Sequence, residues 1–243
     1  MRDAVIVSTA RTPIGKAYRG AFNDTQAQTL GGHAIAHAVD RAGIDPADID
    51  TVLLTHLHPD HSFGLILPDG APAFPNATLY APKTDWEEWT DEANLARNDF
   101  RNTWTAGTLE AVAPYRESLK LFEIGDAILP GVTTHSAAGH SSGQCAYLFE
   151  SEGEKVIFTG DLAHHQIYDP YHPEWFFHMD YDSDPRMGAD AKAAIFKKVV
   201  DENIRYHGYH FPYPGLGRMV RADDGTYRFH AEPVNPRLLP PLK

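Results

Sequence analysis

The string HLHPDH at residues 56–61 constrains the fold of this chain more than any other feature. It follows the apolar run TVLLT, which reads as a buried strand. On an extended chain alternate side chains point the same way, so His56 and His58 can reach one metal ion. The proline then turns the chain and directs Asp60 and His61 toward a second position. Imidazole and carboxylate suit zinc and similar ions, so the pattern indicates a metal site and not a solvated histidine-rich turn.

Short apolar segments alternate with turns that contain Pro and Gly along the rest of the chain. This pattern predicts a mixed α/β chain without internal repeats. Strands are expected at TVLLTH, ATLYAP, AILPGVTTHSA, CAYLFES, KVIFTGD and IRYHGYHF. Helices are expected at residues 82–100, near 107–120 and at 189–203, with a short hairpin at 218–231.

Composition excludes several kinds of partner. The formal net charge of −12, without any basic stripe, argues against a nucleic-acid partner. No apolar run approaches the roughly 20 residues that span a bilayer, so a membrane partner is not expected. The apolar stretch near the N-terminus is short and meets a proline, so it reads as a strand and not as a signal peptide. The single Cys145 excludes an intramolecular disulfide and fits a reducing compartment, so a cytoplasmic location is expected.

Three later segments extend the histidine-rich turn in a recognisable order: AAGHSSGQ, VIFTGD and GYHFPYPGLG. Together these motifs resemble the signature of the metallo-β-lactamase fold superfamily, over about residues 44–230. The resemblance implies an α/β fold of the αββα sandwich type, in which two αβ halves pack sheet on sheet. It implies one metal ion on His56, His58 and His140, a second on Asp60, His61 and His210, and Asp161 as the bridge between them.

Two divalent ions per chain are therefore the expected cofactors, zinc first, with manganese, iron or cobalt as alternatives. Ions about 3.5–4 Å apart share a water and lower its pKa, so a bridging hydroxide is the expected nucleophile. Asp60 and Asp161 are the expected catalytic residues, because each ligates and Asp60 can also accept a proton. The predicted reaction is hydrolysis at phosphorus or at a carbonyl carbon.

The substrate class is harder to read. FPNATLYAPKTDWEEW and GYHFPYPGLGR resemble the branch that holds methyl parathion hydrolase and related lactonases and arylesterases. Phosphotriesters or phosphodiesters are the first expectation, lactones and aryl esters the alternative, and a catalytically inert fusion protein a further one. β-Lactams are disfavoured because the last loop lacks a basic residue for the drug's carboxylate. Aromatic side chains are expected to line an apolar pocket, with Phe63, Tyr168 and Trp175 as first candidates and Trp86, Trp89 and Trp104 as others.

Histidines outside the motifs carry weaker expectations. His164 and His165 follow the predicted bridging aspartate, where they either orient ligands or belong to a plain loop. His207 precedes His210 by three residues, a spacing that places the two on opposite faces of a strand. His135, His172 and His178 are expected at the surface or in the pocket wall, and His33 and His37 as solvated residues of a helix.

The first fifty residues are similar to the N-terminus of thiolases, where such a segment supplies a strand (here 4–10), a loop and a helix (here 25–42). The catalytic cysteine and later motifs of that family are missing, so residues 1–50 are expected to be structural and residues 51–243 to form the metallohydrolase domain. One borrowed strand replaces several in the αββα sandwich and leaves an edge or an apolar face uncovered. A homodimer is therefore expected, with exchange of the N-terminal segment between copies as one arrangement.

Overall fold

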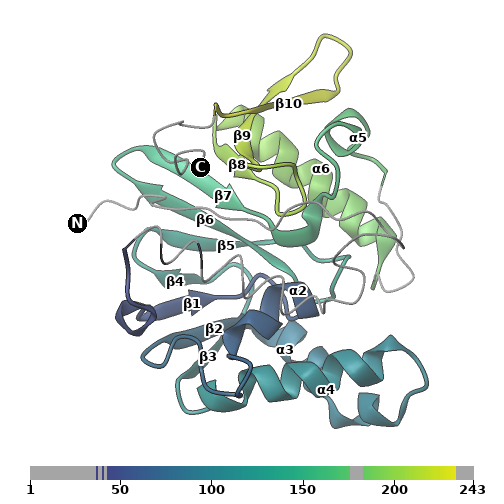
Figure 1. Cartoon of the computed structure of the whole chain (residues 1–243). Helices are drawn as coiled ribbons and strands as arrows, with labels where there is room; N and C mark the ends of the chain where they lie inside the picture. The colour runs from purple at the N-terminus through teal and green to yellow at the C-terminus, as the bar shows by residue number, and fades with distance from the viewer. Residues whose placement is uncertain (1–36, 38–39, 41–42, 176–182, 234–243) are drawn as a thin grey trace, which may run out of the picture. The chain divides into compact units, whose positions relative to one another are not determined.

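The computed structural model describes His37, Asp40 and residues 43–175 and 183–233. These residues fall into two compact units, here called the N-terminal unit, up to Phe122, and the C-terminal unit, from Glu123 (Figure 1). The expected strand at 4–10 lies outside the described residues. Of the expected helix at 25–42 only His37 and Asp40 are described, and both are helical. The replacement of opening strands by a thiolase-like segment therefore stays a prediction.

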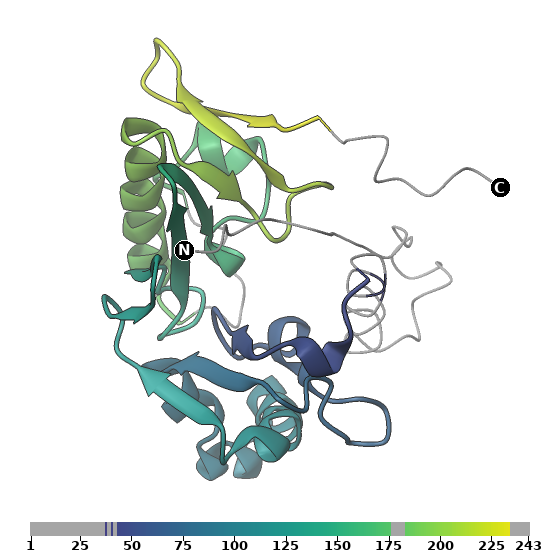
Figure 2. The same cartoon turned by 90° about the vertical axis from the view of Figure 1, so that its left-hand side faces the viewer.

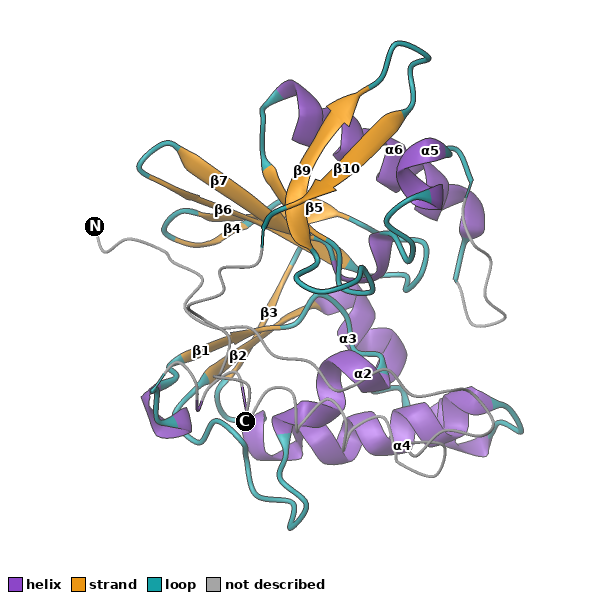
Figure 3. Cartoon of the chain, turned by 45° about the horizontal axis from the view of Figure 1, so that its top comes forward, coloured by secondary structure: helices purple, strands orange, loops and turns teal. Residues whose placement is uncertain are grey.

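A three-stranded parallel sheet in the order β1–β2–β3 forms the centre of the N-terminal unit. The central strand β2 is apolar on both faces, as expected of a parallel strand covered on both sides, and Leu79 and Ala81 are fully buried. Helix α3 packs on β2 and β3, and α4 packs on α3 (Figure 3). The elements are β1 (Thr51–Leu53), α2 (Pro59–Ser62), β2 (Thr78–Pro82), α3 (Lys83–Trp89), α4 (Phe100–Val112) and β3 (Leu119–Phe122), with short 3-10 helices η1 (Pro46–Asp48), η2 (Phe63–Leu65), η3 (Glu92–Ala96) and η4 (Ala113–Tyr115).

The helices of this unit differ from those expected. The single helix expected at 82–100 is broken after Trp89, because the Asp91 side chain accepts a hydrogen bond from the Ala93 amide and starts η3. Helix α4 begins at Phe100, earlier than expected, because Asp99 caps it through the Arg101 amide. Strand β3 was not expected at all.

The C-terminal unit contains a seven-stranded sheet in the order β10–β9–β8–β7–β6–β5–β4. Its neighbours are antiparallel except β7 and β8, whose parallel pairing requires a crossover that α5 and α6 supply. The elements are β4 (Ala127–Leu129), β5 (Val132–Ser136), β6 (Cys145–Ser151), β7 (Glu154–Phe158), η5 (Gly160–Leu162), α5 (Tyr168–Tyr171), α6 (Pro185–Asp201), β8 (Arg205–His207), β9 (Leu216–Arg221) and β10 (Tyr227–Ala231).

Two expectations for this sheet need correction. The strand expected at AILPGVTTHSA is a hairpin of β4 and β5 that turns at Gly131, which has φ +77°. The strand expected at IRYHGYHF ends at His207, and the chain then loops through His210 before β9 begins. The hairpin expected at 218–231 is confirmed as the antiparallel pair β9 and β10.

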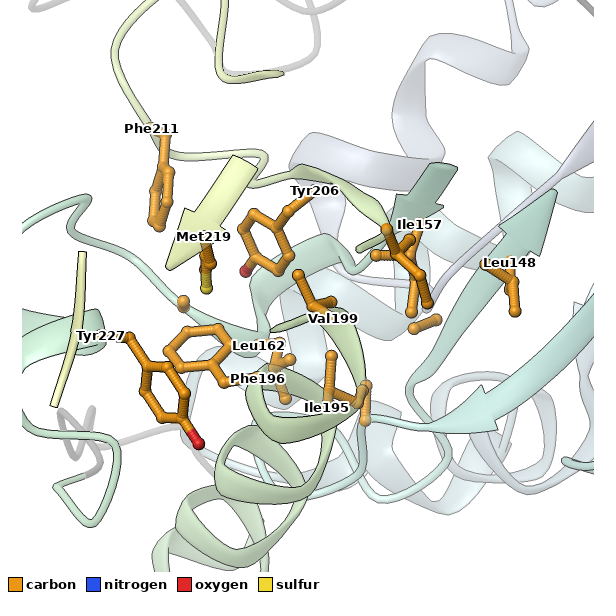
Figure 4. Close-up of a cluster of buried hydrophobic side chains, with 14 residues drawn as sticks. Leu148, Ile157, Leu162, Ile195, Phe196, Val199, Tyr206, Phe211, Met219 and Tyr227 are labelled. Atoms are coloured by element: carbon orange, nitrogen blue, oxygen red, sulfur yellow. The ribbon is translucent and has the colours of Figure 1, made fainter. Parts of the chain in front are cut away.

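Helix α6 supplies the apolar face that covers this sheet (Figure 2). Ile195, Phe196 and Val199 lie on one side of the helix and pack against Ile157 and Tyr206 of the strands (Figure 4). Each such side chain contributes about 1.5–3 kcal/mol when removed from water. This packing fixes α6 firmly on the sheet, which matters for the loops that the helix supports. No helix among the described residues is long and apolar enough to cross a membrane.

Candidate metal centre

The predicted ligands of the N-terminal unit lie just beyond β1. His56 and His58 are buried, and their ring centroids are 4.6 Å apart. His58 is still extended, at φ −63° and ψ 157°, and Pro59 then starts α2, which carries Asp60 and His61. The His61 ring lies 4.1 Å from that of His56, and its Nε2 lies 3.4 Å from Oδ2 of Asp60. The unit therefore brings its four predicted ligands together around one turn.

The backbone of this turn is fixed at Leu57, the residue between the two buried histidines. Its N–H donates to the carboxylate of Asp85, which is fully buried in α3, at 2.6 Å. Its carbonyl accepts from the Ser62 hydroxyl at 3.0 Å and from Thr108 of α4 at 3.3 Å. Asp85 could not be identified from the sequence, because a single carboxylate on a predicted helix reads as a solvated residue.

Three loops of the C-terminal unit carry the other predicted ligands. His140 lies between β5 and β6, Asp161 lies in η5 after β7, and His210 follows β8. Oδ2 of Asp161 lies 3.3 Å from Nε2 of His140 and 3.0 Å from Nε2 of His210. Asp161 and His140 are buried, whereas the His210 side chain is 38% exposed. The unit thus brings together the three residues that the motifs assigned to it.

His164 joins this group, although the sequence left its role open. Its Nε2 lies 3.7 Å from the same Oδ2 of Asp161, and its ring stacks on that of His210 with centroids 5.2 Å apart. His140, Asp161 and His164 each offer a ligand atom, and these atoms lie within 4.8 Å of one another. The spacing of three residues from Asp161, across the single turn of η5, is the signal that could have indicated this.

Helix α6 supports the loop that carries His140. Gly139 has φ +137°, and a Cβ there would overlap the backbone of Gly188 in α6. The Gly139 carbonyl also accepts from the amide of Asp184 at 2.8 Å, and the His140 carbonyl accepts from the amide of Ser183 at 3.2 Å. Only glycine fits a backbone approach this close. Gly139 of the AAGHSSGQ motif therefore allows the close packing on α6 that supports His140.

Burial shifts the pKa of three groups around this unit's loops. The Tyr206 hydroxyl pairs with Thr159 at 3.0 Å, and burial raises the phenol's pKa. Burial lowers the pKa of His207, which packs on Phe158. Burial also lowers the pKa of the Lys192 ammonium, and nearby Asp169 opposes that shift.

The remaining histidines and the predicted pocket residues have ordinary surroundings. His207 belongs to no donor group among the described residues, and Nδ1 of His165 accepts the amides of Ile167 and Tyr168. His172 stacks on Trp175 with centroids 3.6 Å apart. His135 is half-buried in β5, whereas His33 and His178 lie outside the described residues.

The aromatic candidates divide into packed and exposed groups. Trp89 is fully buried, and Trp86, Trp104 and Phe63 pack on the same core, with Phe63 against Gly107 of α4. Tyr168 and Trp175 are more than half exposed, at 54% and 53%. The exposed pair can meet a ligand, and its role in a pocket stays a prediction.

A divalent metal fits the donors that each unit offers. Buried imidazoles and carboxylates are the donor types that zinc and related ions prefer. In the C-terminal unit these imidazole nitrogens converge on one carboxylate oxygen, an arrangement that a cation can share. In the N-terminal unit three imidazoles pack around a turn whose backbone is held independently. The chemistry of both donor sets therefore agrees with the ions that the motifs predict.

Two solved structures are similar in fold to this chain. The crystal structure of hydrolase AbOPH in the beta lactamase superfamily is 28% identical, with a TM-score of 0.73, covering 82% of this chain and 69% of that one. AidC, a dizinc quorum-quenching lactonase solved with N-hexnoyl-L-homoserine, has a TM-score of 0.72 and covers 94% and 75%, although only 23% identical. AidC therefore shows likeness of fold alone.

Two curated relatives match shorter stretches. N-acyl homoserine lactonase from Bacillus thuringiensis is 27% identical over 131 residues, which is 54% of this chain and 45% of that protein. Acetyl-CoA acetyltransferase from Paracoccus denitrificans is 44% identical over 54 residues, 22% of this chain and 14% of that protein. The second match lies in the N-terminal part and agrees with the thiolase-like segment. The chain spans less than half the length of either relative.

The family itself is shown by a longer match. Residues 20–214 match the Metallo-beta-lactamase superfamily, starting before the boundary near residue 44 that the motifs suggested. This match includes the first three motifs, the part of the fourth that carries His210, and the strands up to β8. Because it covers most of the chain, the chain belongs to the metallo-beta-lactamase superfamily and has its α/β fold.

Proposed function

We propose that this chain is a metal-dependent hydrolase that works through a pair of divalent ions held by the seven residues that the motifs identified. The first ion is assigned to His56, His58 and His140, the second to Asp60, His61 and His210, with Asp161 shared. The observation that carries the proposal is the approach of His140 and His210 to one oxygen of Asp161, at 3.3 and 3.0 Å. These two histidines belong to different ions in the assignment, so the carboxylate between them is suited to serve both.

Zinc is the first choice of metal, since AidC is a dizinc enzyme, with manganese, iron and cobalt as alternatives. When bound, such a pair polarises the substrate carbonyl and supplies a nucleophile from water at neutral pH. The chain's own residues hold the donors in place: His56 and His58 are buried, with their backbone anchored at Leu57. The Asp60 side chain is 40% exposed, so its carboxylate can ligate and also accept the proton that the nucleophile loses.

Lactones and related carboxylic esters are the proposed substrates, ahead of phosphoesters. The match to an N-acyl homoserine lactonase and the fold shared with AidC support this order. It reverses the order that the motifs suggested, in which phosphoesters came first. Ile167, Tyr168 and Trp175 are more than half exposed in the segment that follows Asp161, and they suit an apolar acyl group.

A substrate panel tests the order. The zinc and manganese forms are assayed on N-hexanoyl homoserine lactone, an aryl ester, a phosphotriester, a phosphodiester and a cephalosporin. We expect the lactone to give the highest kcat/KM, at least about 10⁴ M⁻¹s⁻¹, the low end of the enzymatic range. A phosphotriester as the best substrate would restore the opposite order, and a cephalosporin as the best would contradict both.

Metal content separates this enzyme from an inert fusion protein. Elemental analysis of the purified chain is expected to give close to two equivalents of metal, and a chelator is expected to remove both metal and activity. Restoring zinc should restore turnover, because the ligands belong to the folded chain. A folded chain that takes up no metal would favour the inert alternative.

A further inference from the structure

A fully buried lysine lies in the C-terminal unit, near the loops that carry the predicted ligands. The Lys192 side chain in α6 is 0% exposed, and lysine is almost never fully buried unless it is paired. Its ammonium donates to Oδ1 of Asp169 at 2.5 Å and also to the backbone carbonyl of Trp175. The Asp169 side chain, at the start of α5, is 2% exposed. The two charges therefore form an ion pair in the interior of the unit.

The second oxygen of Asp169 holds the segment that follows Asp161. Oδ2 of Asp169 accepts the backbone amides of His164 at 2.9 Å and His165 at 2.8 Å. The carboxylate is therefore divided: one oxygen faces the lysine and the other faces two main-chain donors. Hydrogen bonds from amides to a charged carboxylate are among the stronger ones in proteins.

Only two residues separate Asp161 from His164, so fixing the amide of His164 limits how the turn of η5 can move. His164 itself reaches back to Asp161, with Nε2 3.7 Å from Oδ2. The same helix that carries Lys192 also supports the His140 loop at Gly188, one turn earlier. Helix α6 thus reaches two ligand loops, one by direct packing and the other through the buried ion pair.

We propose that Lys192 and Asp169 are positioning residues, which hold the segment from Asp161 to His165 in the geometry that the second metal ion requires. A buried ion pair is weak evidence for a role in stability, because apolar residues of similar size often replace one without loss. One oxygen of Asp169 binds the lysine and the other binds two loop amides, so the ion pair acts on the backbone of residues 164 and 165. The metal-related part of this inference rests on the proposed function, and the effect on the loop does not.

The experiment uses three variants of the full-length chain. Lys192→Met removes the ammonium and keeps the stem of the side chain. Asp169→Asn with Lys192→Gln gives a neutral pair that retains an amide oxygen for the two loop amides, so it leaves no buried unpaired charge if Lys192→Met fails to fold. Lys197→Met is the matched control, because Lys197 lies on the same helix and forms an exposed pair with Asp201.

Hydrogen exchange of the peptide that spans residues 161–168 is measured in the metal-free chains. Lys192→Met is expected to speed exchange of this peptide at least about tenfold, the change that loss of a hydrogen bond to a charged group brings. Peptides from the sheet core should keep their protection, and Lys197→Met should leave the loop unchanged. Unchanged loop exchange in a folded Lys192→Met chain, or equal loss of protection in all peptides, would overturn the proposal.

Metal retention is measured on the same chains by titration with a competing chelator. The second equivalent is expected to bind about 10- to 100-fold more weakly in Lys192→Met, as when other outer supports of metal ligands are removed. The neutral double variant should recover both loop protection and the second equivalent, and failure to recover either would count against the hydrogen-bonding role. If the parent chain binds no metal, the proposed function fails, and the exchange result still decides whether the pair holds the loop.

Discussion

Asp161 has three imidazoles around one of its carboxylate oxygens. One of its oxygens lies within 3.0, 3.3 and 3.7 Å of imidazole nitrogens from His210, His140 and His164. A buried carboxylate requires compensation by a cation or by donors, and imidazoles provide donors only from their protonated nitrogens. A shared metal ion offers compensation to the carboxylate and to neutral imidazoles at the same time.

Replacement of this carboxylate tests the bridge. Asp161→Asn keeps the shape of the side chain and removes its charge, so one amide oxygen remains for two ions. We expect loss of one metal equivalent and a fall in kcat/KM of at least about 100-fold. Loss of a residue that only supports a metal ligand costs up to about 100-fold, and a direct ligand should cost at least as much. Asp190→Asn makes the same chemical change at an exposed position on α6 and should keep both metal and activity. Full metal content in Asp161→Asn would contradict the assignment of a bridge.

Gly139 allows a second test at a single residue. Gly139→Ala places a side chain at φ +137° and drives its Cβ into the backbone of Gly188. The strained backbone alone costs about 1–3 kcal/mol, and the overlap should also displace His140. Gly225→Ala is the control, because its φ of +83° is similarly unfavourable but a Cβ there meets nothing within 4 Å.

Urea unfolding and metal titration are measured on both glycine variants. Gly225→Ala should lose only the backbone contribution and keep its metal. Gly139→Ala should lose more stability and bind metal more weakly. Equal losses in the two variants would show that the contact with Gly188 has no part in placing His140.

At the level of elements, helix α6 ends in a small cluster of charges. Glu202 at its C-cap accepts from Lys198 at 2.6 Å and from Lys155 of β7 at 2.9 Å. Hydrogen bonds from the two lysines hold the pKa of Glu202 at about 2, below its ordinary 4.5. The two cations also offset the unfavourable position of a carboxylate at a helix C-terminus.

This cluster predicts a pH dependence with a definite sign. The pKa of Glu202 is lower in the folded chain, so its contribution is complete above pH 4.5 and is lost as the pH falls toward about 2. Because the group is partly exposed, the contribution is at most about 1 kcal/mol. The free energy of unfolding of Glu202→Gln, relative to the parent in urea, should show the full deficit at pH 6 and a smaller one at pH 3. A deficit that grows as the pH falls would contradict the pairing.

The sequence predicted elements best where the apolar pattern was long. Helix α6 was expected at 189–203, where Ile195, Phe196 and Val199 recur on one face, and the structure places it at Pro185–Asp201. Strand β3 was missed because LKLF is short and two of its four residues are exposed. The break after Trp89 depends on one side-chain cap, which helical periodicity does not reveal.

For the whole molecule, the sequence identified the candidate metal ligands by their chemistry. It missed residues whose partners lie far away along the chain. The ligand types were readable, because imidazole and carboxylate at set spacings are rare in combination. Asp85 lies 28 residues from Leu57, and Lys192 lies 23 residues from Asp169, so neither pairing had a local pattern. Carboxylates and lysines are mostly exposed in proteins, so the sequence alone does not show which of them are buried.

Oligomeric state is a prediction for the whole molecule. If the thiolase-like segment replaces the family's opening strands, a second copy should cover the face that one strand leaves exposed. Light scattering at micromolar concentration is expected to show a homodimer, and deletion of residues 1–24 to lower its solubility or activity. A monodisperse monomer, or a deletion variant that keeps full activity and solubility, would contradict this prediction.

The anchor that Asp169 provides has a consequence for how this enzyme can change. The amides it receives at positions 164 and 165 belong to the main chain, and every amino acid except proline carries one. Side chains there can therefore vary in size and polarity while their attachment persists. Natural or laboratory evolution can therefore substitute residues 164 and 165, close to Asp161, while the main-chain hydrogen bonds to Asp169 remain.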